Sequence, residues 1–179
     1  MPVPVDALEV ESLTFADDGR IPNNPALPAL LYRGALVPDA VDAAACAALF
    51  AANGWPGAWR NGIYADHHFH STGHEVLGIV AGRATVTLGG PEGATVDLAA
   101  GDVVVLPAGT GHKRERASPD LVVVGAYPGG ISPDLLWGDP AEHDRAAAAI
   151  ARVAPPATCP VYGAAGPLLR HWRNGEERT

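Results

Sequence analysis

Several residue types are scarce in this sequence, and each scarcity excludes a class of protein. The 179 residues include two cysteines, Cys46 and Cys159, too few for a disulfide framework and not spaced as a CxxC pair. A reducing compartment is therefore the simpler interpretation. Basic residues are also few, with 12 lysines and arginines against 20 acidic residues and a formal net charge of −8. This balance argues against a nucleic-acid or anionic-membrane partner, because phosphate groups are bound by a basic face.

Long apolar runs are missing as well. No stretch approaches the roughly 18 consecutive apolar residues that indicate a membrane-spanning helix. The first residues, Met-Pro-Val-Pro-Val-Asp, have neither the basic start nor the apolar centre of a signal peptide. With 47% hydrophobic and 18% charged residues, the composition is that of a globular protein, and the length fits one domain. We therefore expect one soluble, cytoplasmic domain.

Two segments show a helical pattern, one on each side of the central part of the chain. Residues 39–53 carry an apolar stripe at helical spacing, with Asp39 placed as N-cap and Gly54 as the stop. Residues 139–151 begin with Asp139 as cap, followed by a proline at the first turn and a glutamate two residues later. The sequence thus predicts one helix before and one helix after the central region.

Between these helices the chain alternates short strands with turns. Residues 83–98 predict a hairpin whose turn is Gly89–Gly93. Residues 103–106 and 121–124 are apolar at every position, so both faces of those strands should be covered by helices, by the N-terminal segment or by a second subunit. Many short antiparallel strands with no helix between them indicate a β-sandwich or a β-barrel.

The terminal segments complete this single domain. Residues 1–37 are rich in proline and should form an arm packed on the strands, with residues 30–32 as a short edge strand. Residues 38–54 give the first helix, 55–130 the β-barrel core, and 131–179 a C-terminal helix and wrapping segment. The surplus of apolar strand faces, with two terminal segments that need a surface, predicts a homodimer.

The candidate metal ligands lie in two places. His68 and His70 are separated by one residue, so on a strand both imidazoles project from the same face. Glu75 follows a Ser-Thr-Gly bend that can turn the chain. A further imidazole, His112, comes after a strand and a Pro-Ala-Gly turn that can direct it back inward. Imidazoles and a carboxylate that converge on one point suit a divalent transition metal.

The two stretches 62–82 and 101–116 resemble the paired signatures of the cupin superfamily. The first signature, G-x5-H-x-H-x4-E-x6-G, is matched by Gly62, His68, His70, Glu75 and Gly82. The second, G-x5-P-x-G-x2-H-x3-N, is matched by Gly101, Pro107, Gly109 and His112, with Arg116 in place of the asparagine. Blocks at residues 17–28, 70–78 and 124–128 further resemble the YjlB-like bacterial cupins.

The resemblance carries expectations about the fold and the metal. It implies an all-β, single-domain cupin jelly-roll β-barrel, here with one helix before and one helix after the barrel. It also implies one divalent transition metal per chain, and Fe, Mn, Ni, Cu, Co and Zn are all chemically acceptable. The implied ligands are His68, His70, Glu75 and His112. Cupin centres keep one or two coordination positions open, which is typical of reactive sites.

Two other histidines compete with these ligands. His67 should point away from the metal if His68 points toward it, because neighbours on a strand face opposite sides. His74 is an alternative to Glu75, since the bend before them lets either side chain reach the metal. The six-residue spacing from Glu75 to Gly82 in the cupin signature favours Glu75.

Candidate catalytic residues follow from the same alternation. Tyr64 and Asp66 share the parity of the two paired histidines, and Arg114 and Arg116 share that of His112. Tyr64, Asp66 and Arg114 are our candidates for catalytic roles. An inward arginine beside an open metal position would pair with a substrate carboxylate. The alternative is that this charged run forms a solvated rim with internal ion pairs.

Three functions compete on these observations. The first is a metal-dependent enzyme that acts on a small organic molecule, for example one with a carboxylate or an enediol. Its leading subclass is an oxygenase, because open positions beside neutral imidazoles admit both substrate and O2. A non-redox isomerase or lyase would instead use the metal as a Lewis acid. The second function is a metal- or ligand-binding module without turnover, and the third is a structural cupin with a vestigial site. The fold alone does not separate them.

Overall fold

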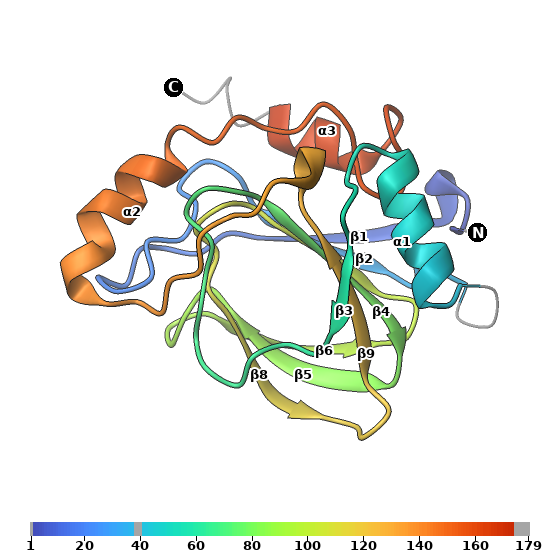
Figure 1. Cartoon of the computed structure of the whole chain (residues 1–179), viewed down its shortest axis with the longest axis horizontal. Helices are drawn as coiled ribbons and strands as arrows, with labels where there is room; N and C mark the ends of the chain where they lie inside the picture. Colours follow the sequence, from blue (N-terminus) through green and yellow to red (C-terminus); the bar gives the residue numbers. More distant parts are fainter. Residues whose placement is uncertain (1, 38–40, 174–179) are drawn as a thin grey trace.

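The computed structural model describes residues 2–37 and 41–173 and consists of two antiparallel β-sheets with helices packed around them (Figure 1). The larger sheet has six strands in the order β1-β2-β7-β4-β9-β3. These are β1 (Glu9–Leu13), β2 (Ala29–Arg33), β7 (Val103–Leu106), β4 (Glu75–Ala81), β9 (Val122–Ala126) and β3 (Trp59–Asn61). The smaller sheet contains β6 (Ala94–Ala99), β5 (Arg83–Leu88) and β8 (His112–Ala117), in that order.

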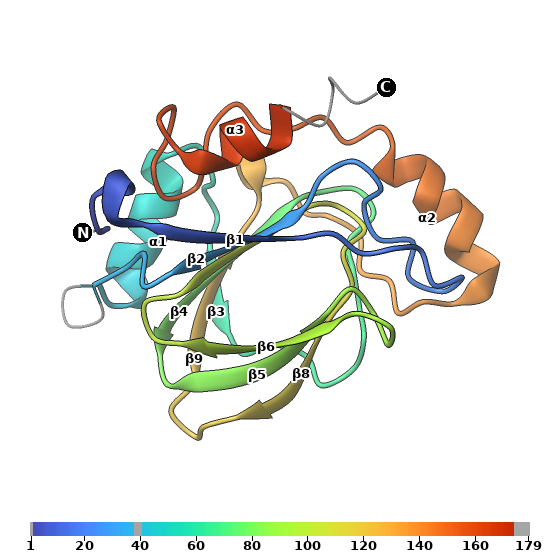
Figure 2. The same cartoon turned by 180° about the vertical axis from the view of Figure 1, so that it is seen from behind.

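Every strand ladder of the described residues is antiparallel, and these ladders leave the two sheets unjoined. The edge strands of the larger sheet lie on opposite sides of the molecule, with β3 toward the viewer in Figure 1 and β1 toward the viewer in Figure 2. The predicted β-rich architecture is therefore confirmed, and it is consistent with a jelly roll. These ladders do not close the two sheets into the expected barrel.

Alternation along the larger sheet divides the core into two clusters. On β2, Leu30 and Tyr32 pack with the helices on one face, whereas Ala29 and Leu31 pack toward the smaller sheet on the other. All four residues of β7 are buried in the same alternating way. The prediction that this strand is covered on both faces is thus confirmed, and the chain's own helices and smaller sheet provide the cover.

The predicted hairpin forms β5 and β6, with residues 89–93 as its connection. Val86 pairs with Val96, and Leu88 pairs with Ala94. Gly89 and Gly90 have φ angles of 87° and 82°, a left-handed conformation that favours glycine. The composition of the turn therefore follows from its backbone geometry.

The N-terminal segment contributes β1 and β2 to the larger sheet. Residues 30–32 were expected to form an edge strand, and this expectation is wrong. β2 lies between β1 and β7, so β1 occupies the edge. Arg33, at the end of β2, donates hydrogen bonds to Glu11 on β1 and to Asp102 just before β7. These contacts join the two N-terminal strands to the centre of the sheet.

Within residues 2–37 and 41–173 the structure has three α-helices, one more than the two expected. They are α1 (Ala43–Ala52), α2 (His143–Ile150) and α3 (Pro167–Arg173), with short 3-10 turns η1 (Val5–Ala7), η3 (Pro128–Gly130) and η4 (Pro140–Glu142). The N-cap of α1 is Asp42, whose side chain accepts a hydrogen bond from the amide of Ala45 at 2.8 Å. The predicted cap, Asp39, lies outside the described residues. Asp139 does act as a cap, but for η4, which leads into α2.

The C-terminal segment packs back onto the sheet through α3. Trp172 is 1% exposed, and its indole nitrogen donates a hydrogen bond to the carbonyl of Pro28 at 2.9 Å. Its ring lies 4.7 Å from that of His74, centre to centre. No helix within the two described ranges has the length and apolar character needed to cross a membrane.

Trp172→Ala should lower the free energy of unfolding by about 3–5 kcal/mol, because it removes a large buried side chain and leaves a cavity. Urea unfolding followed by circular dichroism measures the change. Trp137, which is 46% exposed, provides the matched control, and Trp137→Ala should cost about 1 kcal/mol or less. Equal losses in the two variants would show that α3 is not docked as described.

Candidate metal centre

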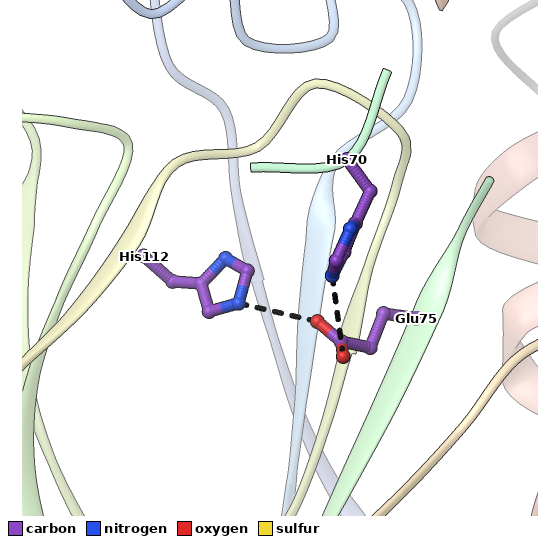
Figure 3. A group of neighbouring side chains, drawn as sticks. All are labelled: His70, Glu75 and His112. Atoms are coloured by element: carbon purple, nitrogen blue, oxygen red, sulfur yellow. Dashed lines mark ion pairs between the residues drawn. The ribbon is translucent and has the colours of Figure 1, made fainter. Parts of the chain in front are cut away.

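Three of the four predicted ligands meet in one place. The ligand atoms of His70, Glu75 and His112 all lie within 4.8 Å of one another (Figure 3). His70 Nε2 is 3.5 Å from one carboxylate oxygen of Glu75, and His112 Nε2 is 3.2 Å from the other. Glu75 begins β4 of the larger sheet and His112 begins β8 of the smaller one. The cluster therefore draws its ligands from both sheets.

The carboxylate of Glu75 is buried, with 3% of the residue exposed. Its Oε2 atom is among the few buried side-chain atoms of the described residues that have no hydrogen-bond partner. Burial alone would raise the pKa of Glu75, but the neighbouring His112 and His70 outweigh it and hold the pKa well below its ordinary value. A buried carboxylate is costly unless a cation compensates its charge, so this donor set fits a divalent metal ion.

The outer nitrogens of the histidines are held by the backbone. Each Nδ1 donates a hydrogen bond to a main-chain carbonyl: His68 to Asp66 at 2.9 Å, His112 to Thr110 at 3.1 Å, and His70 to Asp134. A proton fixed on Nδ1 leaves the lone pair on Nε2. This is the tautomer of a metal ligand, oriented by an outer hydrogen bond.

His68 lies beside the cluster but is not one of its three members. Its ring centre is 3.9 Å from that of His112 and 6.3 Å from that of His70. His68 and His112 also pair through their backbones, with N–O distances of 3.2 and 2.9 Å. Burial, followed by the charge of His112, lowers the pKa of His68 to about 3, so its imidazole is neutral near pH 7. The fourth predicted ligand is therefore adjacent to the cluster and neutral.

The two competing histidines are placed elsewhere. His74 is 1% exposed, its Nδ1 accepts a hydrogen bond from the amide of Ala108 at 2.9 Å, and its Nε2 donates to the carbonyl of Ala154 at 3.0 Å. Both nitrogens of His74 are thus used by the backbone, and Glu75 is the residue that faces the other two ligands. His67 lines a separate cavity, together with Asp66.

A cavity of about 510 Å³ opens beside the three ligands. Its lining comes from β3 on one side and from β8 on the other, which are edge strands of the two sheets. Sequence reasoning missed several of its lining residues, namely Trp59, Arg60, Leu77, Tyr127 and Leu135. The Trp59 indole donates a hydrogen bond to the hydroxyl of Tyr127 at 3.1 Å, and the Tyr127 ring lies 5.5 Å from that of His70.

The alternation of side chains along β9 could have indicated that Tyr127 and Trp59 lie at the cavity. Val123 faces the core between the sheets, so Gly125 and Tyr127, two and four positions later, share its direction. Gly125 pairs with Trp59, and a Cβ atom on Gly125 would lie 2.0 Å from the Trp59 ring. The glycine therefore leaves the space in which Trp59 reaches the cavity.

Of the two predicted residues before His68, only Tyr64 lines the cavity. The ring of Tyr64 is 5.0 Å from that of His68 and is T-shaped against it. The side chain of Asp66 is exposed and lies on the other cavity, so its predicted inward direction is wrong. The reason is that β3 ends at Asn61 and residues 65–66 form a bend. Strand alternation does not continue from Asp66 to His68.

Arg114 lines the cavity and Arg116 does not. In the pairing of β8 with β5, Arg114 is opposite Val86 and Arg116 is opposite Thr85. The two arginines are two positions apart on β8, but their partners are adjacent on β5. A β-bulge at Glu115 therefore interrupts the alternation. Val86 belongs to the core and directs its partner inward, so the expectation that both arginines face inward is wrong for Arg116.

Comparison with known proteins identifies the family. The cupin domain family matches residues 56–124. The Bacillus subtilis (strain 168) protein described as "Uncharacterized protein YjlB" is 40% identical over 164 residues, which cover 92% of this chain and 97% of that protein. The chain therefore belongs to the cupin family, and within it to the relatives of YjlB.

Two solved structures show a weaker likeness. Acireductone dioxygenase from Bacillus anthracis, with a cadmium ion in its active center, is 20% identical with a TM-score of 0.37, over 50% of this chain and 61% of that chain. The DMSP lyase DddQ from Ruegeria pomeroyi DSS-3 is 16% identical with a TM-score of 0.37, over 77% of this chain and 56% of that chain. The present chain spans less than two thirds of either structure, and likeness at this level carries no argument about its substrate.

The buried, neutral His74 predicts a loss of stability in acid. Burial lowers its pKa from 6.5 to about 4, so the unfolded state takes up the proton first as the pH falls. Stability that is complete above pH 6.5 should fall by about 2 kcal/mol between pH 7 and 5 on account of this group. His74→Gln removes the titrating group, so urea unfolding of the metal-free variant should show a smaller drop. Identical drops in both proteins would contradict the assignment.

Proposed function

We propose that this cupin is a metal-dependent enzyme that acts on a small anionic organic molecule in the cavity beside Glu75. One observation carries the proposal: a buried carboxylate, one oxygen of which has no hydrogen-bond partner, lies between two imidazoles whose Nε2 atoms face it, at the wall of a cavity. Imidazole nitrogens and a carboxylate that face one another at a cavity wall are a donor set that suits a divalent transition metal.

His70, Glu75 and His112 would hold the metal, and His68, beside them, would join as the fourth ligand. One divalent ion of Fe, Mn, Ni, Cu, Co or Zn would supply Lewis acidity and, for the redox-active metals, electron transfer. Three neutral imidazoles and one carboxylate leave such a centre with net positive charge. The site therefore favours an anionic ligand.

The chain's own groups would bind and orient that ligand. Arg60 and Arg114 line the cavity, and within the described ranges neither forms an ion pair. A guanidinium group without a partner suits a carboxylate, which it can bind through two parallel hydrogen bonds. Burial raises the pKa of Tyr127, so its hydroxyl stays protonated near neutral pH and can donate a hydrogen bond to the ligand. Tyr64 is placed to contact a ligand at the mouth of the cavity.

An oxygenase is the leading subclass, because the cavity gives both a substrate and O2 access to the ligand cluster. A non-redox isomerase or lyase is the alternative, and a binding module without turnover is the second. The homodimer and the cytoplasmic location stay predictions. The apolar faces of β7 that motivated the homodimer are covered within the chain, so the mass in solution has to decide it.

Changing a ligand should remove the metal. His112→Ala and Glu75→Gln each delete one donor of the cluster, so elemental analysis of protein purified without added metal should show a strong loss of metal. His67→Ala is the matched control and should keep nearly the full metal content, because His67 lines the other cavity. Iron in the wild type would favour the oxygenase, whereas zinc or manganese would favour Lewis-acid chemistry. Loss of metal in all three variants would sink the assignment.

Arg114→Gln should weaken the binding of small carboxylates to the metal-loaded protein by about 1.5–3 kcal/mol, the range for a hydrogen bond to a charged group. This corresponds to roughly a 10- to 150-fold loss of affinity. Titration calorimetry with mono- and dicarboxylates of different chain lengths measures it. Arg116→Gln changes the same residue type outside the cavity and should leave affinity and metal content unchanged. Equal affinities of the wild type and Arg114→Gln would refute the role of Arg114.

A further inference from the structure

A segment far along the chain lies against the bend that carries His70. Residues 131–137 lie between η3 and η4. Phe69 and Leu136 form an antiparallel bridge, with N–O distances of 2.9 and 3.0 Å in the two directions. Both side chains are buried in the small cluster that also contains Ile21. The backbone just before His70 is thereby attached to this distant segment.

Asp134 attaches the backbone just after His70. Its carboxylate accepts hydrogen bonds from the amide of Ser71 at 2.7 Å and from the amide and hydroxyl of Thr72, both at 3.1 Å. The Ser71 hydroxyl donates to the same carboxylate, and the amide of Asp134 donates to the Thr72 hydroxyl oxygen at 2.9 Å. The carbonyl of Asp134 accepts the Nδ1 proton of His70. One residue thus contacts three consecutive residues of the bend.

Gly73 allows this close contact. A Cβ atom at Gly73 would lie 2.7 Å from the end of the Ile131 side chain and 3.1 Å from Pro133. The segment therefore packs directly on the bend. This packing brings Asp134 within hydrogen-bond distance of residues 70–72.

The three histidines beside the candidate metal differ in how they are oriented. The Nδ1 acceptors of His68 and His112 are carbonyls two positions away on the same stretch of chain. The acceptor of His70 is 64 positions away. Among these three, His70 is the one whose orientation depends on a remote part of the sequence.

From these contacts we infer that Asp134 is a positioning residue for metal binding, which holds the imidazole of His70 in the orientation and tautomer of a ligand. The inference rests on the metal centre proposed above. The Asp134 side chain fixes the position of its own carbonyl relative to the bend, and that carbonyl keeps the proton of His70 on Nδ1. Asp134 itself is not a ligand, because its carboxylate is engaged by Ser71 and Thr72.

The test is the binding of Co2+ to the full-length protein after its metal has been removed. Asp134→Ala keeps the backbone carbonyl but removes the carboxylate that positions it, so Co2+ binding measured by titration calorimetry should weaken by about 10- to 100-fold, the range for a disturbed outer hydrogen bond to a ligand. At saturating Co2+ its visible absorption bands should also shift, because the donor set or its geometry changes. Asp134→Asn keeps an oxygen that can accept from the amides of Ser71 and Thr72, so it should restore part of the affinity.

Asp102→Ala provides the matched control. The Asp102 carboxylate accepts three hydrogen bonds, from Gly34 at 2.8 Å, Ala99 at 3.0 Å and Arg33 at 3.2 Å, against four for Asp134, but Asp102 does not line the metal cavity. This variant should lose comparable thermal stability and keep the wild-type affinity and spectrum. Wild-type affinity in Asp134→Ala, or an equal loss in Asp102→Ala, would overturn the inference while leaving the metal centre intact. Failure of the wild type to bind Co2+ would overturn both.

Discussion

The buried carboxylate of Glu75 is the constraint on which the rest of this structure depends. It begins a central strand of the larger sheet and is 3% exposed, so its charge must be compensated by groups brought to it. His112 comes from the smaller sheet and His70 from the bend before β4. The carboxylate therefore needs the two sheets to keep their relative position, and the core cluster between the sheets holds them there.

The sequence predicts three of the four residues at the candidate metal centre that the structure brings together, because each lies in a short motif with local geometry. The signature spacing identifies His70, Glu75 and His112, and the choice of Glu75 over His74 agrees with the backbone contacts that occupy both nitrogens of His74. The strands and hairpin follow from apolar alternation and from glycines at turns. All of these features are set by neighbours within a few residues, so a single sequence contains them.

The misplacements arise where alternation is interrupted. A bend at residues 65–66 turns Asp66 away from the cavity, and a bulge at Glu115 does the same to Arg116. Neither interruption has a sequence signal as strong as a proline or a paired glycine. The inward direction of Tyr127 could have been predicted, because every second residue along β9 faces the same side. Asp134 was not, because its role depends on a contact between residues 64 positions apart.

Residues 131–137 have two tasks that cannot be separated. Pro133 and Leu135 form part of the cavity wall, while Asp134, between them, forms hydrogen bonds with the bend that carries His70. If the proposed metal centre is present, a mutation of Pro133 or Leu135 that reshapes this wall would also shift Asp134, whose carbonyl accepts the proton of His70. Under the proposed function, the ligand specificity and the metal affinity of this chain would therefore change together. Arg60, on β3, lines the same cavity, so a change there would alter the wall without touching residues 131–137.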